Sequence, residues 1–114
     1  MSEDLKRRTK EFAIRVVKLV RALPSTIDGR AMGNQLIRSG TSVAANYRAA
    51  CRARSKPEFI SKLGVAEEEA DESVFWLEMV VDTQLLDHKR VDSLLKEANE
   101  LVAILVASRK SAKK

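Results

Sequence analysis

Apolar residues recur every three or four positions along most of the chain, and polar residues fill the places between them. This spacing is typical of amphipathic helices, whereas the strict alternation that would indicate strands never extends over a useful length. The apolar stripes predict helices over about 4–23, 28–54 and 55–85, and a fourth helix that starts after Asp87. Because the connections are short, we expect an all-α, antiparallel up-down four-helix bundle that occupies residues 1–114 as one domain.

Residues that cap or interrupt helices mark the same boundaries. Pro24 ends the first stripe, and either Ser25 or Asp28 can accept a backbone N–H at the start of the second. The segment 55–58, Ser-Lys-Pro-Glu, combines a capping box with a proline that a first helical turn tolerates, so it marks the start of the third helix. Asp87 can cap the fourth.

The second predicted helix has three faces with different chemistry. Its core face holds Met32, Leu36, Val43, Tyr47 and Cys51. At about 100° per residue, four arginines fall within a sector of about 80° on the far side. They are Arg30, Arg38, Arg48 and Arg52. Between these faces lie small and polar residues that would let another helix approach closely, and they include Ser39, Ser42, Asn46 and Ala49.

Two features of this helix depend on packing. Residues 39–42, Ser-Gly-Thr-Ser, are poor helix formers, so a continuous helix needs tertiary contacts, and the alternative is a break or kink near Gly40. We expect Asn46 to bond a neighbouring helix or subunit, because a buried amide without a partner costs about 1 to 3 kcal/mol.

The third predicted helix carries more apolar surface than one core stripe explains. Val65, Phe75, Trp76 and Met79 point away from the core residues of the same helix. Monomers rarely leave such a patch in water, so we expect a subunit interface. The alternative is that Trp76 packs against a neighbouring helix end. The predicted interface consists of Ser39, Ser42, Asn46, Ala49, Phe75, Trp76 and Met79.

Charge is segregated along the chain. Residues 1–56 carry 13 Lys/Arg against 4 Asp/Glu, residues 57–87 carry 1 against 9, and residues 88–114 carry 7 against 3. The net charges are +9, −8 and +4 in that order, within a total of +5. This pattern indicates complementary surfaces and an anionic partner. The basic tail after Ala107 has no apolar partner, so we expect the last residues to fray.

No catalytic or metal-binding constellation is recognisable. The lone His88 does not supply the Glu-x-x-His pairs of ferritin-like sites, and Cys51 on a core face indicates a small buried hydrophobe. We therefore expect no enzyme activity, no metal and no cofactor. The longest apolar run, 101–107, is far shorter than the roughly 20 residues of a membrane span, and the first ten residues lack the apolar run of a signal peptide. A cytoplasmic protein without membrane contact is expected.

Three short matches resemble the four-helix bundle protein family, also called the 23S rRNA-intervening-sequence proteins. They are Gln-Leu-Ile-Arg at 35–38, Ser-Val-Ala-Ala-Asn at 42–46, and Arg-Ser-Lys-Pro-Glu-Phe at 54–59 followed by Leu63. Many members have Ile-Ala-Glu-Gly after the Asn, whereas this chain has Tyr-Arg-Ala-Ala at 47–50. The resemblance implies a bundle that assembles into a ring-shaped homopentamer. The fold is also similar to that of an accessory protein that partners a reverse transcriptase and is thought to bind nucleic acid.

Two functional hypotheses follow. The first is a non-enzymatic homo-oligomer that binds RNA or DNA, or a nucleic-acid enzyme, through basic surface that includes Arg30, Arg38, Arg48 and Arg52. The second is a scaffold in which the Arg-rich and Glu-rich helices pair between subunits, with no nucleic-acid role. The chain contains few aromatic residues for base stacking, so any nucleic-acid contact should be mostly with phosphates.

Overall fold

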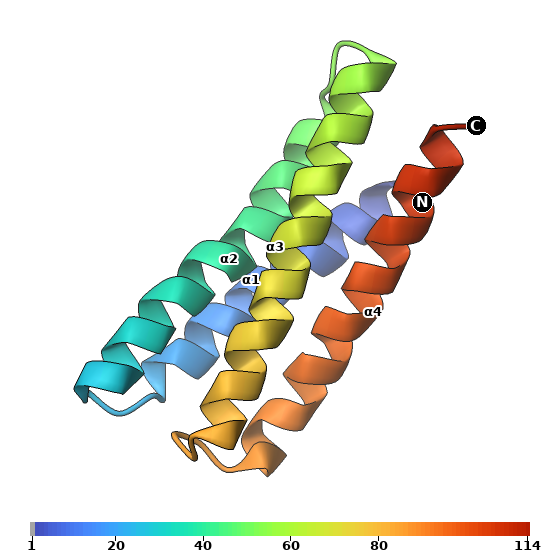
Figure 1. Cartoon of the computed structure of the whole chain (residues 1–114). Coiled ribbons are helices and arrows are strands. Elements are labelled where there is room, and N and C mark those ends of the chain that lie inside the picture. Colours follow the sequence, from blue (N-terminus) through green and yellow to red (C-terminus); the bar gives the residue numbers. More distant parts are fainter. Residues whose placement is uncertain (1) are drawn as a thin grey trace.

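The computed structural model describes residues 2–114 and consists of four α-helices (Figure 1). In chain order they are α1 (Ser2–Arg21), α2 (Ile27–Cys51), α3 (Lys56–Asp82) and α4 (His88–Ala112). Consecutive helices pack side by side in antiparallel directions, and α1 also contacts α4. The bundle measures 44 × 20 × 19 Å. The prediction of an all-α, antiparallel up-down arrangement is confirmed.

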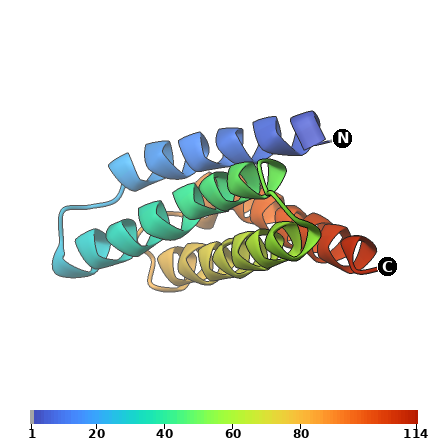
Figure 2. The same ribbon diagram turned by 90° about the horizontal axis from the view of Figure 1, so that it is seen from above.

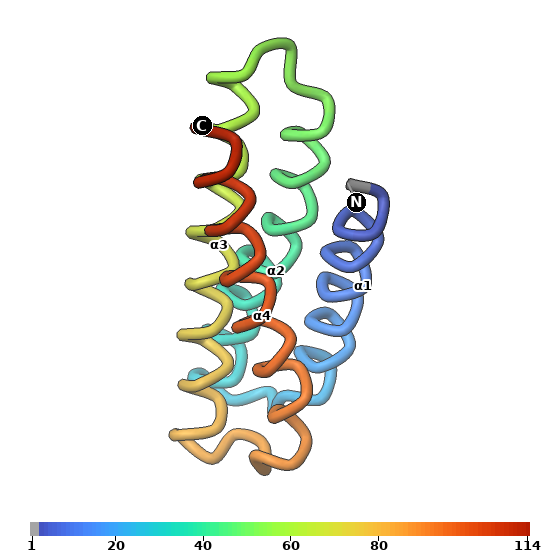
Figure 3. Tube along the Cα trace, turned by 90° about the vertical axis from the view of Figure 1, so that its right-hand side faces the viewer, coloured from blue at the N-terminus to red at the C-terminus, as the bar shows by residue number. Residues whose placement is uncertain are grey.

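The four pairs of neighbouring helices differ in how extensively they contact each other. α2 packs against α1 on one side and α3 on the other, so α1 and α3 are separated (Figures 2 and 3). The contact of α1 with α4 is the least extensive, and side-chain polar groups bridge it. The Arg8 guanidinium donates to Glu97 at 2.7 and 2.8 Å and to Glu100 at 2.6 Å, while Arg15 donates to Ser93 at 2.9 Å.

Caps define most helix starts as predicted, with one correction. The Ser55 hydroxyl accepts from the Glu58 N–H at 3.2 Å, and the Asp87 carboxylate accepts from the Lys89 N–H at 2.9 Å. Asp28, one of the two predicted caps, accepts from the Gly29 N–H at 3.0 Å, but the residue in the cap position of α2 is Thr26. Its hydroxyl accepts from the Gly29 N–H at 3.1 Å, because the turn before α2 folds tightly onto that glycine.

The C-terminal ends of three helices also differ from the predictions. α2 stops at Cys51 rather than near residue 54. α3 stops at Asp82 rather than near residue 85, since Gln84 adopts a φ of 61°, which helical backbone does not allow. α4 continues to Ala112, although fraying was expected after Ala107. Arg109 explains this difference, because its guanidinium donates to Glu67 of α3 at 2.8 Å and ties the end of α4 to the bundle.

The core is formed by apolar residues from all four helices. The largest fully buried ones are Phe12 and Val16 of α1, Leu36 and Val43 of α2, Leu63 and Leu77 of α3, and Leu101 and Leu105 of α4. None of the helices in the described part of the chain is long and apolar enough to span a bilayer.

α2 passes through residues 39–42 without a break. Gly40 lies against Val16 of α1, and the Ser39 hydroxyl accepts a hydrogen bond from Ser73 of α3 at 2.9 Å. Both contacts need small residues on α2. Tertiary packing on two sides therefore holds a segment of low helix propensity in helical form.

Candidate nucleic-acid interface

The four predicted arginines of α2 lie in three different environments. Arg38 faces α3, where its guanidinium donates to Glu69 at 3.0 Å and, at shorter range, to Glu72. Arg30 lies at the other end of α2 and donates to the Ser25 carbonyl at 2.6 Å. Only Arg48 and Arg52 face a common hollow. The four arginines point in similar directions from α2, but they do not form one surface because different parts of the chain lie beside them.

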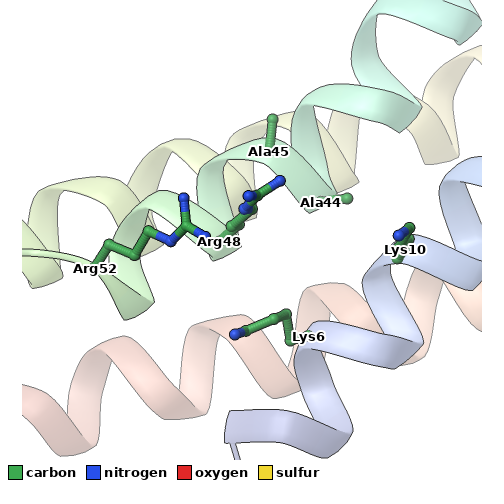
Figure 4. A pocket seen from close by; sticks show the side chains of 6 residues that line it. All are labelled: Lys6, Lys10, Ala44, Ala45, Arg48 and Arg52. Atoms are coloured by element: carbon green, nitrogen blue, oxygen red, sulfur yellow. The ribbon is translucent and has the colours of Figure 1, made fainter.

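Arg48 and Arg52 line a hollow of about 450 Å³ between α2 and α1 (Figure 4). Lys6 and Lys10 line it from the α1 side, and small residues of α2, Ala44 and Ala45, complete the lining. We call this site the basic cleft. Because the alanine side chains are small, they leave space between the cations through which an anion could approach the charged groups from solvent.

Most of the charge in the basic cleft is not neutralised locally. Lys6 lies 3.3 Å from Glu3, but both side chains are exposed and such a pair contributes little. Within residues 3–114, no carboxylate lies within 4 Å of the charged nitrogens of Lys10, Arg48 or Arg52. The cleft therefore keeps positive potential available for a ligand.

The positive surface continues beyond the cleft. Arg48 and Arg52 also line a second open hollow of about 460 Å³, together with Ala49, Arg54 and Glu58. Glu58 is engaged at the turn, where its carboxylate accepts from the Arg54 N–H at 3.3 Å. Together the two hollows form a basic track around the C-terminal end of α2, lined without aromatic side chains.

Sequence reasoning missed Lys6, Lys10 and Arg54 as members of this site. A helical wheel of α1 shows which side of that helix is basic, but it does not show which helix lies beside that side. The expected antiparallel packing of the first two helices could have predicted these members of the site. It places the start of α1 beside the end of α2, where Arg48 and Arg52 lie.

The predicted interface residues of α2 differ in exposure. Ser39 has no exposed surface and contacts Ser73, so it cannot contact a second subunit as predicted. Ser42, Asn46 and Ala49 are half-buried. The Asn46 amide donates to the Ser42 carbonyl of its own helix at 2.9 Å rather than to another helix of the described chain, and its bond to a second subunit stays a prediction.

The predicted interface residues of α3 lie at the surface. Phe75 is 51% exposed, and its ring contacts Trp76 edge to face with 4.9 Å between centroids. The Trp76 indole N–H donates to Glu72 at 3.4 Å, and Met79 is half-buried. Trp76 is half-buried and packs partly against the core of its own chain, while the ring of Phe75 beside it stays exposed.

The pKa values of two neighbouring carboxylates of α3, Glu69 and Glu72, are shifted in opposite directions. The Arg38 guanidinium lowers the pKa of Glu72, whereas burial raises the pKa of Glu69 beside it. Within the described residues, no group of three or more His, Cys, Asp or Glu side chains is placed to hold a metal ion.

Comparison with known proteins identifies relatives over nearly the whole chain. The sequence model of the 23S rRNA-intervening sequence protein family matches residues 3–107. A crystal structure of a protein of unknown function from the S23 ribosomal protein family of Bacteroides thetaiotaomicron is similar, with a TM-score of 0.89 and 34% sequence identity. The match covers 96% of this chain and 97% of that one. Among curated proteins, no sequence matches. On the family match and the structural similarity, the chain belongs to the 23S rRNA-intervening sequence protein family.

Proposed function

We propose that this protein is a non-enzymatic homo-oligomeric module that binds nucleic acid through the basic cleft. The observation that carries the proposal is the convergence of Lys10, Arg48 and Arg52 in a hollow where no carboxylate pairs with them. Cations placed in this way attract phosphates, and alanines beside them leave room for a nucleic-acid backbone.

The chemistry of the basic cleft favours backbone binding over sequence recognition. Its polar groups are guanidinium and ammonium donors, which contact phosphate oxygens, and no aromatic ring is present to stack on a base. RNA and DNA should therefore both bind, with little dependence on sequence. In a ring-shaped assembly, such as the homopentamer that the family resemblance implies, each copy would add a cleft, and weak contacts would sum by avidity.

The rival function is a scaffold whose arginines pair with carboxylates of another subunit. Arg38 weakens this alternative, because its carboxylate partners Glu69 and Glu72 belong to the same chain. Of the four predicted arginines, Arg30, Arg48 and Arg52 have no carboxylate partner in the described part of the chain and would remain for pairing between subunits. A nucleic-acid enzyme such as a reverse transcriptase is the protein partner that the fold similarity to the accessory protein suggests, and the cleft could hold nucleic acid beside it.

A salt titration tests the proposal. Binding of the wild type to mixed-sequence RNA and DNA should weaken linearly on a log–log scale, with a slope near −0.9 per phosphate on duplex DNA and about −0.7 on single strands. Replacing Arg48 and Arg52 by Ala should reduce the magnitude of the slope by about 1.8 on duplex DNA and about 1.4 on single strands if each guanidinium neutralises one phosphate. The assembly should keep its mass.

The matched control removes the same charge elsewhere. Lys89 and Arg90 are exposed at the start of α4, at the opposite end of the bundle from the cleft (Figure 1). Their double Ala variant should keep the wild-type slope. Equal slopes for the two double variants, or no binding by the wild type at low salt, would contradict the proposal. Dissociation of the Arg48/Arg52 variant, without nucleic-acid binding by the wild type, would support the scaffold.

A further inference from the structure

An apolar hollow lies next to the basic cleft on the same side of the molecule. Ala13, Ile14 and Val17 of α1 and Thr41 of α2 line a volume of about 390 Å³. We call this hollow the apolar groove. Ile14 is 45% exposed there, and Ile37, one turn before Thr41 on α2, is 36% exposed.

Cations surround the apolar groove. Lys10, Lys18 and Arg21 of α1 line it together with the apolar residues. In residues 3–114 none of these three side chains forms an ion pair with a carboxylate. The groove thus combines an apolar floor with a positive rim, which suits a partner that has apolar side chains bordered by acids.

The outer surface of α3 has the complementary character. Val65, Phe75, Trp76 and Met79 form what we call the aromatic face, in which Val65 is 38% and Phe75 51% exposed. Acidic residues flank this face along the same helix. Glu68 lies seven residues before Phe75, and Asp82 lies seven after it, so both fall on nearly the same line of the helix. Both are exposed and neither forms an ion pair in the described part of the chain.

We infer that the aromatic face of one copy of this chain docks in the apolar groove of a second copy. One chain cannot make this contact with itself, because α1 and α3 lie on opposite sides of α2 (Figures 2 and 3). Phe75 supplies the exposed ring for the apolar floor, and the acids beside it meet the cations of the rim. This contact replaces the predicted one through α2, whose Ser39 is buried within its own chain.

Charge also decides the symmetry of the contact. Two aromatic faces packed on each other would bring their acidic flanks together, and two grooves would bring their cations together. Like charges opposed in this way disfavour both self-complementary arrangements. The contact is therefore heterologous, so each copy uses its groove with one neighbour and its aromatic face with another, which generates a ring when the rotation closes.

This inference deepens the homo-oligomeric part of the proposed function and does not require nucleic-acid binding, although the groove and the basic cleft share Lys10. Two variants block one side each. Ile14→Glu places a carboxylate in the groove, and Phe75→Glu places one in the aromatic face, and both sites are exposed enough for the fold to tolerate the change. Ile27→Glu is the control, since Ile27 is 83% exposed and belongs to neither surface.

The decisive experiment is a mass measurement on the separate and mixed variants, with circular dichroism to verify the helices. The wild type and Ile27→Glu should form the same oligomer, while Ile14→Glu and Phe75→Glu should each fall to the mass of one chain, 12.7 kDa. An equimolar mixture of the two blocked variants should give a particle of two chains. In it, the intact aromatic face of Ile14→Glu fills the intact groove of Phe75→Glu, while the remaining contact sets two carboxylates against each other.

The other outcomes overturn the inference. If only Phe75→Glu dissociates, the contact joins two aromatic faces, and if only Ile14→Glu dissociates, it joins two grooves. A monomeric wild type, or a mixture that stays monomeric, excludes docking between copies. Because nucleic-acid binding is measured separately by the salt titration, a monomer that still binds at low salt would refute this interface and leave the basic cleft standing.

Discussion

Gly40 of α2 lies directly against Val16 of α1, and a Cβ atom built on Gly40 would approach the two Val16 methyl carbons to 2.8 and 2.9 Å. A similar approach occurs about two turns earlier along α2, where a Cβ on Gly33 would lie 3.0 Å from Val20. The glycines of α2 therefore set how closely the first two helices pack, and this packing in turn forms the walls of the basic cleft and the apolar groove.

Gly40→Ala should destabilise the chain although alanine is the better helix former. Overpacking typically costs about 1 to 3 kcal/mol, against a helix-propensity gain of about 1 kcal/mol, and the branched Val16 side chain cannot swing aside easily. Urea denaturation followed by circular dichroism measures the difference. Gly64→Ala is the control, because its Cβ would meet only Arg109 Cδ at 3.7 Å and should stabilise the chain. Recovery in the Gly40→Ala/Val16→Ala double variant would confirm the contact, whereas a Gly40→Ala chain as stable as the wild type would refute it.

Ser39→Leu should lower the stability of the isolated chain. Ser39 and Ser73 are fully buried and share a hydrogen bond at 2.9 Å, so the site between α2 and α3 has no room for a larger side chain. Ser39→Ala should cost only about 1 kcal/mol, since the Ser73 hydroxyl also lies 2.9 Å from the Glu69 carbonyl, which can accept from it. Ser61→Leu, at an exposed position of α3, is the control for denaturation. Equal midpoints for the two leucine variants would show that Ser39 is not confined.

The fluorescence of Trp76 should report the protonation of Glu72. The Glu72 carboxylate accepts hydrogen bonds from both Arg38 and the Trp76 indole, and Trp76 is the only tryptophan. Because Arg38 lowers the pKa of Glu72, the stabilising contribution of this carboxylate is present above the usual glutamate range and is lost as pH falls through its lowered pKa. An acid titration should therefore show a fluorescence midpoint below 4.5, the ordinary value.

Two variants separate this carboxylate from its neighbour. Arg38→Gln should move the fluorescence midpoint upward, and Glu72→Gln should abolish the transition. Burial raises the pKa of Glu69, so this residue does not account for a fluorescence midpoint below 4.5. Glu69→Gln should therefore keep the acidic fluorescence transition of Glu72. A midpoint that Arg38→Gln does not change would contradict the proposed link between Arg38 and Trp76.

Tyr47 should make the stability of the fold sensitive to alkali. Burial raises the pKa of Tyr47 to about 12 from 10.0 in the folded chain. Since the folded pKa is the higher one, its contribution to stability is complete below pH 10.0 and is lost as pH rises toward about 12. Tyr47 is the only tyrosine, so tyrosinate absorbance follows it alone. Tyr47→Phe should lose less stability than the wild type over this window, and ionisation of the folded wild type near pH 10.0 would contradict the prediction.

Much of the fold could be predicted from local patterns in the sequence. The apolar spacing indicates the four helices, and the segment 55–58 marks the turn into α3 because a capping box satisfies backbone N–H groups of its own first turn. The exposure of Phe75 was also predictable. Helical periodicity fixes the side of α3 on which each side chain lies, and Phe75 lies on the side opposite the core stripe.

Contacts between helices were decided only by the tertiary structure. A helical wheel gives the direction of Arg38, Arg48 and Arg52 around one axis, but it does not show that α3 supplies carboxylates to the first while α1 brings Lys10 to the other two. Likewise, Ser39 belongs to a small-residue face in the sequence, and only the position of Ser73 turns that face inward. Partners separated by 31 or more residues meet through packing, which local periodicity does not encode, so the sequence determined the helices and the structure determined which charges remain free.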